Sequence, residues 1–298
     1  MLSILIPTYN YNIVSLVDSL HKQLAKTKTV FEIICLDDVS DRKTIALNEE
    51  INKLPFTRYE LSEQNKGIAI TRQFLVEKAK YDWVILLDAD TELIDNTFIP
   101  KYLDATNLGF NFVFGGFAYK NTKPKKNYLL RWVYGKRCEA ISAYKRNKNP
   151  YKITIAANLL VKKEVYKSFN LDIIGKQYAM DYYFGAALKE RNSKVLHIDN
   201  QVYHLGIEKS EAYLRKKEKA VETLLNLYRL KMILPHSHSN NLLSIFINLK
   251  KLKLNYIFAA FFKITKPILQ NNLFGKYPIV LLLQFYKISY MCYIDLTN

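Results

Sequence analysis

The first 120 residues alternate short apolar runs with segments of helical periodicity, and this alternation restricts the possible fold more than any other feature of the chain. Strand-like runs occupy residues 3–7, 31–37, 56–61 and 83–88, and helical patterns occupy residues 13–25, 43–53 and 68–79. Strands separated by single helices favour crossover connections that keep the strands parallel. The sequence therefore predicts an α/β fold built on a mostly parallel sheet flanked by helices.

Polar residues follow three of the predicted strands. They are Pro7, Thr8 and Tyr9 after the first strand, Asp37 and Asp38 after the second, and Asp88 and Asp90 after the fourth. Parallel sheets bind ligands at the carboxyl ends of their strands, where the connecting loops gather. We therefore expect these three loops to converge on one site.

The fourth strand, in the run VILLDAD, leads to two carboxylates one residue apart. A turn-forming Asp is the commoner explanation for a single acid at such a place. Side chains at positions i and i+2 of an extended chain point to the same side, so Asp88 and Asp90 are expected to converge. Converging negative charges are costly without a cation, and Mg or Mn bridging a phosphate is the usual partner. The spacing therefore predicts a metal site, provided that a ligand brings phosphates.

The chain is strongly basic. It has 298 residues, with 44 basic and 27 acidic side chains and a net charge of +17, which favours a polyanion, an anionic membrane surface or a phosphorylated substrate. Residues 120–152 contain eleven basic residues and one acid. A solvated helix face is the ordinary explanation for such a run, and a lid or an acceptor site is the alternative. Trp132, Tyr134 and Arg137 are candidates for an acceptor groove, with a core or lid role left open.

The C-terminal part, residues 207–298, is expected to be a helical extension with basic and apolar faces. Between His236 and Ile294 there are seven lysines and no acid, among apolar clusters such as YIFAAFF. Such helices can lie in a membrane interface, with their lysines near anionic lipid. A helical subdomain packed on the rest of the chain, or on a second copy, is the open alternative. No apolar run reaches the roughly 18 residues of a spanning helix.

Two features bear on localisation. The start MLSILIPTYN has no basic region or cleavage site of an export signal. Cys35, Cys138 and Cys292 have neither metal-binding nor disulfide spacing, which favours a reducing compartment. Together with the basic and apolar extension, they predict a cytoplasmic protein in peripheral contact with the inner face of the plasma membrane.

Four segments resemble the family 2 glycosyltransferases, in order and correctly spaced over residues 2–206; they are SILIPTYN, EIICLDDVSD, NKGIAITRQFLVEKAKYDWVILLDAD and VYHLG. The resemblance implies a GT-A catalytic domain at residues 1–206, with the extension at 207–298. It implies a metal-dependent, inverting transfer of a sugar from a nucleotide-sugar, UDP-sugar being favoured, to a hydroxyl of a glycan or lipid-linked acceptor. A role in bacterial surface polysaccharide, lipopolysaccharide or glycolipid synthesis is expected, with Mn or Mg as the cation.

The resemblance also implies roles around the nucleotide. Pro7, Thr8 and Tyr9 would approach the base, Tyr9 by stacking on it. Asp38 would accept a hydrogen bond from the uracil imide. Asp37 is the less certain member of the pair, with a structural cap or turn as its alternative role.

Four further positions match the diphosphate and metal region of the family. Arg72 would contact the nucleotide or the diphosphate, an exposed helix arginine being the alternative. Asp88 would reach the sugar or the ribose. Asp90 would bind the metal directly and His204 would complete its shell, a mixed set of ligands that suits Mn somewhat better than Mg. Gly67 would provide backbone freedom where the helix carrying Arg72 begins.

Asp181, in YAMDYYFGAAL, matches the general base that takes the proton from the acceptor hydroxyl. Met180 departs from the family pattern, which often has Glu at that position, so Asp172 is kept as the alternative base. The structural alternative for Asp181 is an N-cap on a helix that begins near Tyr182.

Two other functional hypotheses compete with this one. A basic nucleic-acid-binding protein agrees with the charge and with aromatic residues among lysines, but the chain has no recognised nucleic-acid-binding motif. The D-x-D would also have no role in it. A glycosyltransferase-like scaffold without turnover is suggested by Met180 alone.

Overall fold

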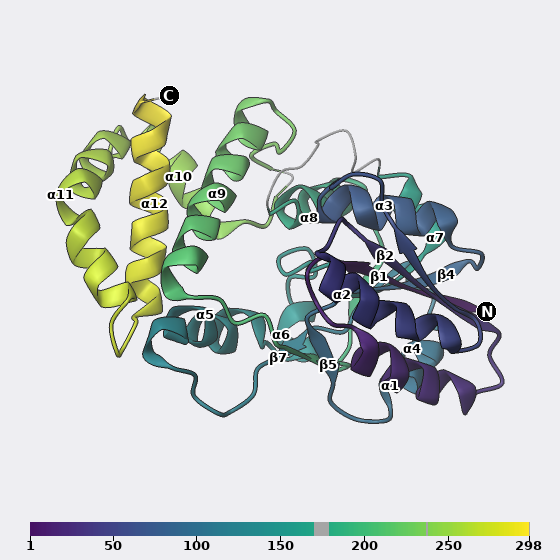
Figure 1. The fold of residues 1–298 in the computed structure, drawn as a ribbon. Coiled ribbons are helices and arrows are strands. Elements are labelled where there is room, and N and C mark those ends of the chain that lie inside the picture. Colours follow the sequence, from purple (N-terminus) through teal and green to yellow (C-terminus); the bar gives the residue numbers. More distant parts are fainter. Residues whose placement is uncertain (170–178, 237, 298) are drawn as a thin grey trace.

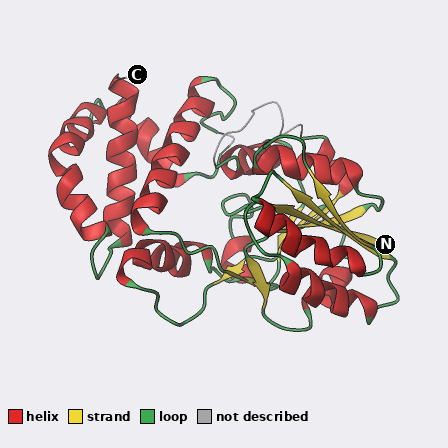
Figure 2. Ribbon diagram, viewed as in Figure 1, coloured by secondary structure: helices red, strands yellow, loops and turns green. Residues whose placement is uncertain are grey.

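A layered α/β unit lies beside a bundle of C-terminal helices in the computed structural model, which describes residues 1–169, 179–236 and 238–297 (Figure 1). The strands are confined to the α/β unit, and the bundle is helical throughout (Figure 2). The predicted α/β class with a helical C-terminal extension is confirmed.

The main sheet has seven strands in the order β3-β2-β1-β4-β8-β6-β9. They are β1 (Leu2–Thr8), β2 (Phe31–Asp37), β3 (Thr57–Leu61), β4 (Trp83–Leu87), β6 (Phe112–Phe114), β8 (Asn158–Lys162) and β9 (Val195–His197). Within the described residues, β8 runs antiparallel to both of its neighbours, and the other pairs are parallel. Every residue of β1 and β2 is buried, as expected where helices cover both faces of a parallel sheet.

Helices cover the two faces of this sheet in separate layers (Figure 1). One layer contains α1 (Val14–Ala25) and α4 (Phe98–Ala105), and the other contains α3 (Ile68–Lys78), α7 (Lys163–Lys167) and α8 (Asp181–Glu190). Ile4 and Ile6 of β1 pack in the first layer and Leu5 packs in the second, because neighbouring residues of a strand face opposite sides. The helix expected at 43–53 is divided into α2 (Arg42–Asn48) and a 3-10 turn, η1 (Glu49–Lys53).

A small second sheet closes the edge of the α/β unit near the D-x-D. It consists of β5 (Thr91–Leu93), β7 (Phe117–Ala118) and β10 (Val202–His204), in the order β5-β10-β7. His204 is the last residue of β10 and lies opposite Thr91 of β5. This pairing carries His204 to the loop that follows β4.

The basic segment and the C-terminal part are both folded against the α/β unit. The basic segment forms η2 (Lys126–Tyr128), α5 (Leu129–Tyr134), the π-helical turn η3 (Gly135–Glu139) and α6 (Ala143–Asn147). The bundle comprises α9 (Ser210–Arg229), α10 (Asn241–Lys251), α11 (Asn255–Leu273) and α12 (Val280–Thr297). Its apolar cores include Ala69 and Met180 of the α/β unit and Leu130 of the basic segment, so the extension packs on the rest of the chain. Among the described residues, no helix has both the length and the apolar character needed to cross a bilayer.

Candidate active site

The loops after β1 and β2 are joined by backbone and side-chain hydrogen bonds. The Asp38 N–H donates to the Thr8 carbonyl over 2.8 Å, and the Asn10 N–H donates to Ser40 Oγ over 2.6 Å. Thr8 is buried, whereas the ring of Tyr9 is 57% exposed beside this junction. The structure therefore brings Pro7, Thr8 and Tyr9 next to the acids after β2, as the sequence predicted.

Asp37 has the structural role that was its alternative. It is fully buried, and its two carboxylate oxygens accept hydrogen bonds from the Ser40 N–H and the Tyr59 hydroxyl, both over 2.6 Å. Burial, and then the hydrogen bond to Asp37, raise the pKa of Tyr59. Asp37 thus shapes the turn after β2.

Asp38 holds the beginning of α3. Its carboxylate accepts hydrogen bonds from the backbone N–H groups of Lys66 and Gly67, over 2.6 and 2.8 Å. Gly67 has a φ of 79°, a conformation that suits glycine, so the predicted need for backbone freedom is confirmed there. A carboxylate has about four lone-pair sites, so these two hydrogen bonds leave acceptor capacity on Asp38.

Arg72 is a buried member of the site. It is 9% exposed, and its Nη2 lies 2.5 Å from Asp88 Oδ1, so the alternative of an exposed helix arginine is wrong. Burial would lower the pKa of the Arg72 guanidinium, but the nearby carboxylates of Asp88 and Asp181 outweigh it and raise the pKa. Among the described residues the buried Arg72 Nε has no hydrogen-bond partner, which leaves one donor for a ligand.

The two acids of the D-x-D lie after the end of β4 and have different partners. β4 ends at Leu87, and Ala89 and Asp90 lie in a turn. Asp88 pairs with Arg72, whereas Asp90 Oδ2 lies 3.5 Å from His204 Nε2. The strand therefore ends one residue earlier than predicted, but the two acids still lie close enough for the negative charge of Asp88 to raise the pKa of Asp90.

Asp90 and His204 form a partly buried acid and imidazole pair. Burial raises the pKa of Asp90, with His204 opposing this effect, and burial lowers the pKa of His204, with Asp90 opposing it. Gly206 follows the pair, and a Cβ at that position would clash with the Asp90 carboxylate. The glycine in VYHLG therefore allows the backbone to pass close to Asp90.

The pair fits part of a divalent cation shell. His204 Nε2 lies between Asp90 Oδ2 at 3.5 Å and Arg131 Nη2 at 3.4 Å, and a neutral ring nitrogen cannot donate to one while it accepts from the other. The Nε2 lone pair and the Asp90 carboxylate would be able to share a cation, which would replace the contact between Nε2 and Arg131. Among the described residues, no group of three His, Cys, Asp or Glu side chains could hold a metal. Mg²⁺ sites that use one or two carboxylates together with substrate phosphates need no such group.

Arg131 and Glu139 are site residues that the sequence analysis did not select. Arg131 Nη1 lies 3.0 Å from Glu139 Oε2, and the Tyr119 hydroxyl donates to the same carboxylate. Burial would raise the pKa of Glu139, but Arg131 and then Lys217 outweigh it and lower the pKa to about 2. The rings of Tyr119 and Tyr213 lie 5.3 and 5.1 Å from the Arg131 guanidinium carbon. One feature of the sequence could have pointed to this pair, because Glu139 is the one acid in a segment with eleven basic residues.

Asp181 is the first residue of α8, and it lies beside Arg72 and Asp88. Burial raises the pKa of Asp181, Arg72 opposes this shift and Asp88 adds to it. Met180 is the N-cap of α8, and no described side chain caps the helix, so the structural alternative of an N-cap role for Asp181 is wrong. The alternative base, Asp172, lies outside the described residues.

Comparison with known families matches residues 3–169 to the family described as glycosyl transferase family 2. An uncharacterised glycosyltransferase of Haemophilus influenzae is 30% identical over 122 residues, which make up 38% of this chain and 38% of that protein. The match therefore spans well under half of this relative's length.

Solved structures share the fold at low sequence identity. Mannosyl-3-phosphoglycerate synthase from Rubrobacter xylanophilus has a TM-score of 0.56 at 14% identity, with 78% of this chain and 74% of that chain covered. The mannosyltransferase PcManGT from Pyrobaculum calidifontis, in complex with GDP-Man and Mn²⁺, has a TM-score of 0.52 at 12% identity (76% and 64% covered). S. aureus TarS 1–349 in complex with UDP-GlcNAc has a TM-score of 0.51 at 17% identity (76% and 66% covered).

These neighbours establish a GT-A fold, with the D-x-D loop and the loops after β1 and β2 at one edge of the sheet. Because the family model covers residues 3–169, more than half of the 298-residue chain, the protein belongs to glycosyl transferase family 2.

Proposed function

We propose that the protein is a metal-dependent, inverting glycosyltransferase. It transfers a sugar from a nucleotide-sugar, with UDP-sugar favoured, to a hydroxyl of a glycan or lipid-linked acceptor in bacterial surface polysaccharide, lipopolysaccharide or glycolipid synthesis. The observation that carries the proposal is the placement of the Arg72–Asp88 and Asp90–His204 pairs, with Asp181 beside the first, at one edge of the sheet. UDP-GlcNAc in one structural neighbour, and GDP-Man with Mn²⁺ in another, support a nucleotide-sugar donor and a divalent cation.

The donor nucleotide would lie across the ends of β1 and β2. The exposed ring of Tyr9 is available to stack on the base, beside Pro7 and Thr8. Asp38 would accept from the uracil imide with the lone pairs that Lys66 and Gly67 leave unused. Arg72 would donate its unpaired Nε–H to the donor diphosphate, while Asp88 keeps the guanidinium in place and can reach the sugar or ribose.

Asp90 and His204 would hold the cation through one carboxylate and one imidazole, a set of donors compatible with Mn and Mg. When bound, the cation would neutralise charge that develops on the leaving nucleoside diphosphate. Arg131 lies 3.4 Å from His204 Nε2 and adds a fixed positive charge at this edge of the site. The pair with Glu139 fixes the position of Arg131.

Asp181 would be the general base. In an inverting transfer the acceptor oxygen forms a bond to the anomeric carbon while the bond to the diphosphate oxygen breaks, and Asp181 takes the acceptor proton. A general base works best when its pKa approaches the operating pH, and burial shifts the pKa of Asp181 in that direction. The positive charge of Arg72 opposes the rise in the pKa of Asp181 and so favours its carboxylate form.

The exposed side of α11 supports peripheral contact with an anionic membrane, at the inner face of the plasma membrane. Ile257, Phe261, Ile264 and Ile268 follow helical spacing and are 51%, 51%, 72% and 69% exposed. Apolar residues on one helix face, together with lysines in the same helix, suit an interfacial position. We assign this contact to the extension at residues 207–298 and the transfer chemistry to residues 1–206.

The test is calorimetric titration of the purified protein with UDP, and with other nucleoside diphosphates, each in Mn²⁺ and in chelator. We expect UDP-selective binding that chelator weakens. Asp90→Ala should abolish the dependence on Mn²⁺, whereas Asp82→Ala, an exposed acid just before β4, should keep it. Absence of nucleotide binding, or full Mn²⁺-dependent binding by Asp90→Ala, would refute the proposal.

A further inference from the structure

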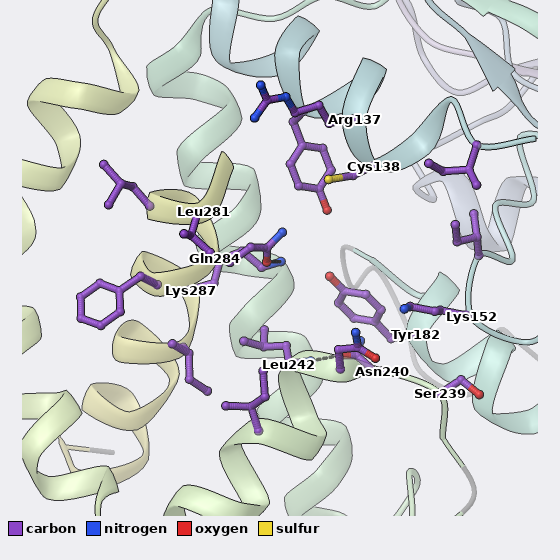
Figure 3. Close-up of a pocket in the computed structure, with 18 of the residues that line it drawn as sticks. Arg137, Cys138, Lys152, Tyr182, Ser239, Asn240, Leu242, Leu281, Gln284 and Lys287 are labelled. Atoms are coloured by element: carbon purple, nitrogen blue, oxygen red, sulfur yellow. Dashed lines mark hydrogen bonds between the residues drawn. The ribbon is translucent and has the colours of Figure 1, made fainter. Parts of the chain in front are cut away.

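A cavity of about 950 Å³ lies between the α/β unit and the helical bundle. Figure 3 shows Arg137 and Cys138 on one side of it, Tyr182 and Lys152 on another, and Lys287 of α12 facing them. This volume is within the range of sites that enclose a small organic ligand. The cavity lies outside the donor site described above.

The polar part of the cavity is positively charged. Its basic lining residues are Arg137, Lys145, Lys152 and Lys287, and no described lining residue is acidic. Lys287 is 6% exposed, and among the described residues its ammonium donates to Gln284 Oε1 over 3.1 Å but pairs with no carboxylate. A buried ammonium without a carboxylate is costly, so the cavity is complementary to an anion.

The neighbourhood of Lys287 strengthens this preference. Burial, and then the positive charge of Lys217, lower the pKa of Lys287 to about 8. Burial also lowers the pKa of Lys217 to about 8, although Glu139 opposes the shift. An anion close to Lys287 would relieve the repulsion between these two lysines and raise both pKa values.

Much of the remaining wall of the cavity is apolar. Leu242 and Ile288 are buried in it, whereas Leu281 and Ile245 are 75% and 49% exposed at its rim. Together with Leu282 and Phe285, they give a hydrocarbon surface that continues from the buried lysine to solvent. A ligand that satisfies both parts has an anionic group and an alkyl chain.

The cavity also adjoins the catalytic residues. Tyr182, which lines it, follows the proposed base Asp181 in α8. Tyr134 lines it as well, and the ammonium of Lys217 lies 4.5 Å from the Tyr134 ring centroid. The positive charge of Lys217 in turn helps to lower the pKa of Glu139, which pairs with Arg131. A ligand in the cavity therefore lies beside the proposed site of transfer.

We infer that this cavity binds the lipid phosphate that carries the sugar acceptor, with the phosphate at Lys287 and Arg137 and the alkyl chain along α10 and α12 toward the rim. This inference rests on the proposed function and names its acceptor class. It assigns a role to the basic segment at residues 120–152, which contributes Arg137, Lys145 and Lys152 to the cavity.

The test is calorimetric titration with monomeric farnesyl phosphate in chelator, so that a cation at Asp90 does not contribute. We expect farnesyl phosphate to bind, and we expect inorganic phosphate and farnesol each to bind at least about tenfold more weakly. Lys287→Met, which replaces the buried ammonium by an apolar side chain of similar length, should weaken farnesyl phosphate about tenfold or more. If inorganic phosphate or farnesol bound as tightly as farnesyl phosphate, the inference would be overturned.

Two exposed lysines of the basic segment provide a matched comparison. Lys145→Glu should weaken farnesyl phosphate binding, because Lys145 lines the cavity, whereas Lys148→Glu should not, because Lys148 does not line it. Equal effects of the two variants would overturn the inference, since general surface charge would then account for binding.

UDP titration of the same variants in Mn²⁺ separates the two proposals. Unchanged UDP binding with lost farnesyl phosphate binding in Lys287→Met supports both. UDP binding without farnesyl phosphate binding by the unmodified protein overturns the cavity inference and leaves the donor chemistry intact. Lys287-dependent farnesyl phosphate binding without nucleotide binding supports the lipid-phosphate cavity and refutes the proposed transfer.

Discussion

Replacing Glu139 by Gln tests how much the buried ion pair with Arg131 stabilises the folded protein. The side chains of Arg131 and Glu139 are 8% and 14% exposed, so water screens their interaction little. Glu139→Gln keeps the shape of the side chain but leaves Arg131 and Lys217 without its negative charge. We expect a large loss of unfolding free energy, because removing one partner of a buried pair leaves an uncompensated charge.

The magnitude follows from the pKa of Glu139. Its value falls from 4.5 to about 2, and about 1.36 kcal/mol per unit gives a stabilisation of about 3 kcal/mol at pH 7. Because the folded-state pKa is the lower one, this stabilisation is complete well above the unfolded-state pKa and is lost as the pH falls toward 2. By the linkage between pKa and stability, roughly 2 kcal/mol of this stabilisation remains at pH 3.5.

Urea unfolding of both proteins at pH 7 and pH 3.5 measures this difference. Glu50→Gln is the control, because Glu50 pairs with Lys53 at 2.5 Å on the exposed surface, and we expect a change within about 1 kcal/mol. Arg131→Met combined with Glu139→Gln should cost less than the sum of the single changes. A loss below about 1 kcal/mol for Glu139→Gln at pH 7, or strict additivity, would contradict the argument.

Three further predictions concern the site and the bundle. Asp181→Asn should lower kcat about 10²-fold or more. In the unmodified enzyme, kcat should fall as the pH is lowered, with a midpoint above the ordinary pKa of an aspartate, because the base must be ionised and burial raises its pKa. An unchanged kcat in Asp181→Asn would exclude Asp181 as the base. Arg72→Met should weaken binding of UDP with Mn²⁺ about tenfold, as measured by calorimetry, and equal affinity would remove Arg72 from the donor site. Ile264→Glu combined with Ile268→Glu should reduce co-sedimentation with anionic vesicles more than tenfold, because both side chains are exposed on α11. The control is Leu108→Glu, at an exposed leucine outside α11, which should leave co-sedimentation unchanged. If the control lost as much co-sedimentation as the α11 variant, an interfacial position of α11 would be contradicted.

The regular elements of the first 100 residues were predictable because their signals are local. The predicted strand at 31–37 is β2, and the helix predicted at 68–79 differs from α3 by one residue. The division of the helix predicted at 43–53 was not predictable. Asn48 ends α2 with a buried side chain that bonds the Ile13 N–H and the Tyr11 carbonyl, and these partners lie more than 30 residues away.

The edge of the sheet at which the candidate site residues gather was predictable from the sequence, but their pairing was not. The apolar run before Asp88, and the polar residues after β1 and β2, locate the carboxyl edge of the sheet from sequence alone. Which carboxylate meets Arg72, and which meets His204, depends on the turn after Leu87 and on the pairing of β10 with β5.

Sequence therefore determines the α/β class, the catalytic edge and the candidate donor residues, because strand periodicity and the placement of acids after strands are short-range properties. Tertiary structure alone decides that Glu139, Arg131 and Lys217 meet in one buried cluster, and that α10 and α12 enclose a basic cavity against Tyr182. The physical reason is that both features require packing between segments tens of residues apart. Burial then turns ordinary surface residue types into strongly interacting charges.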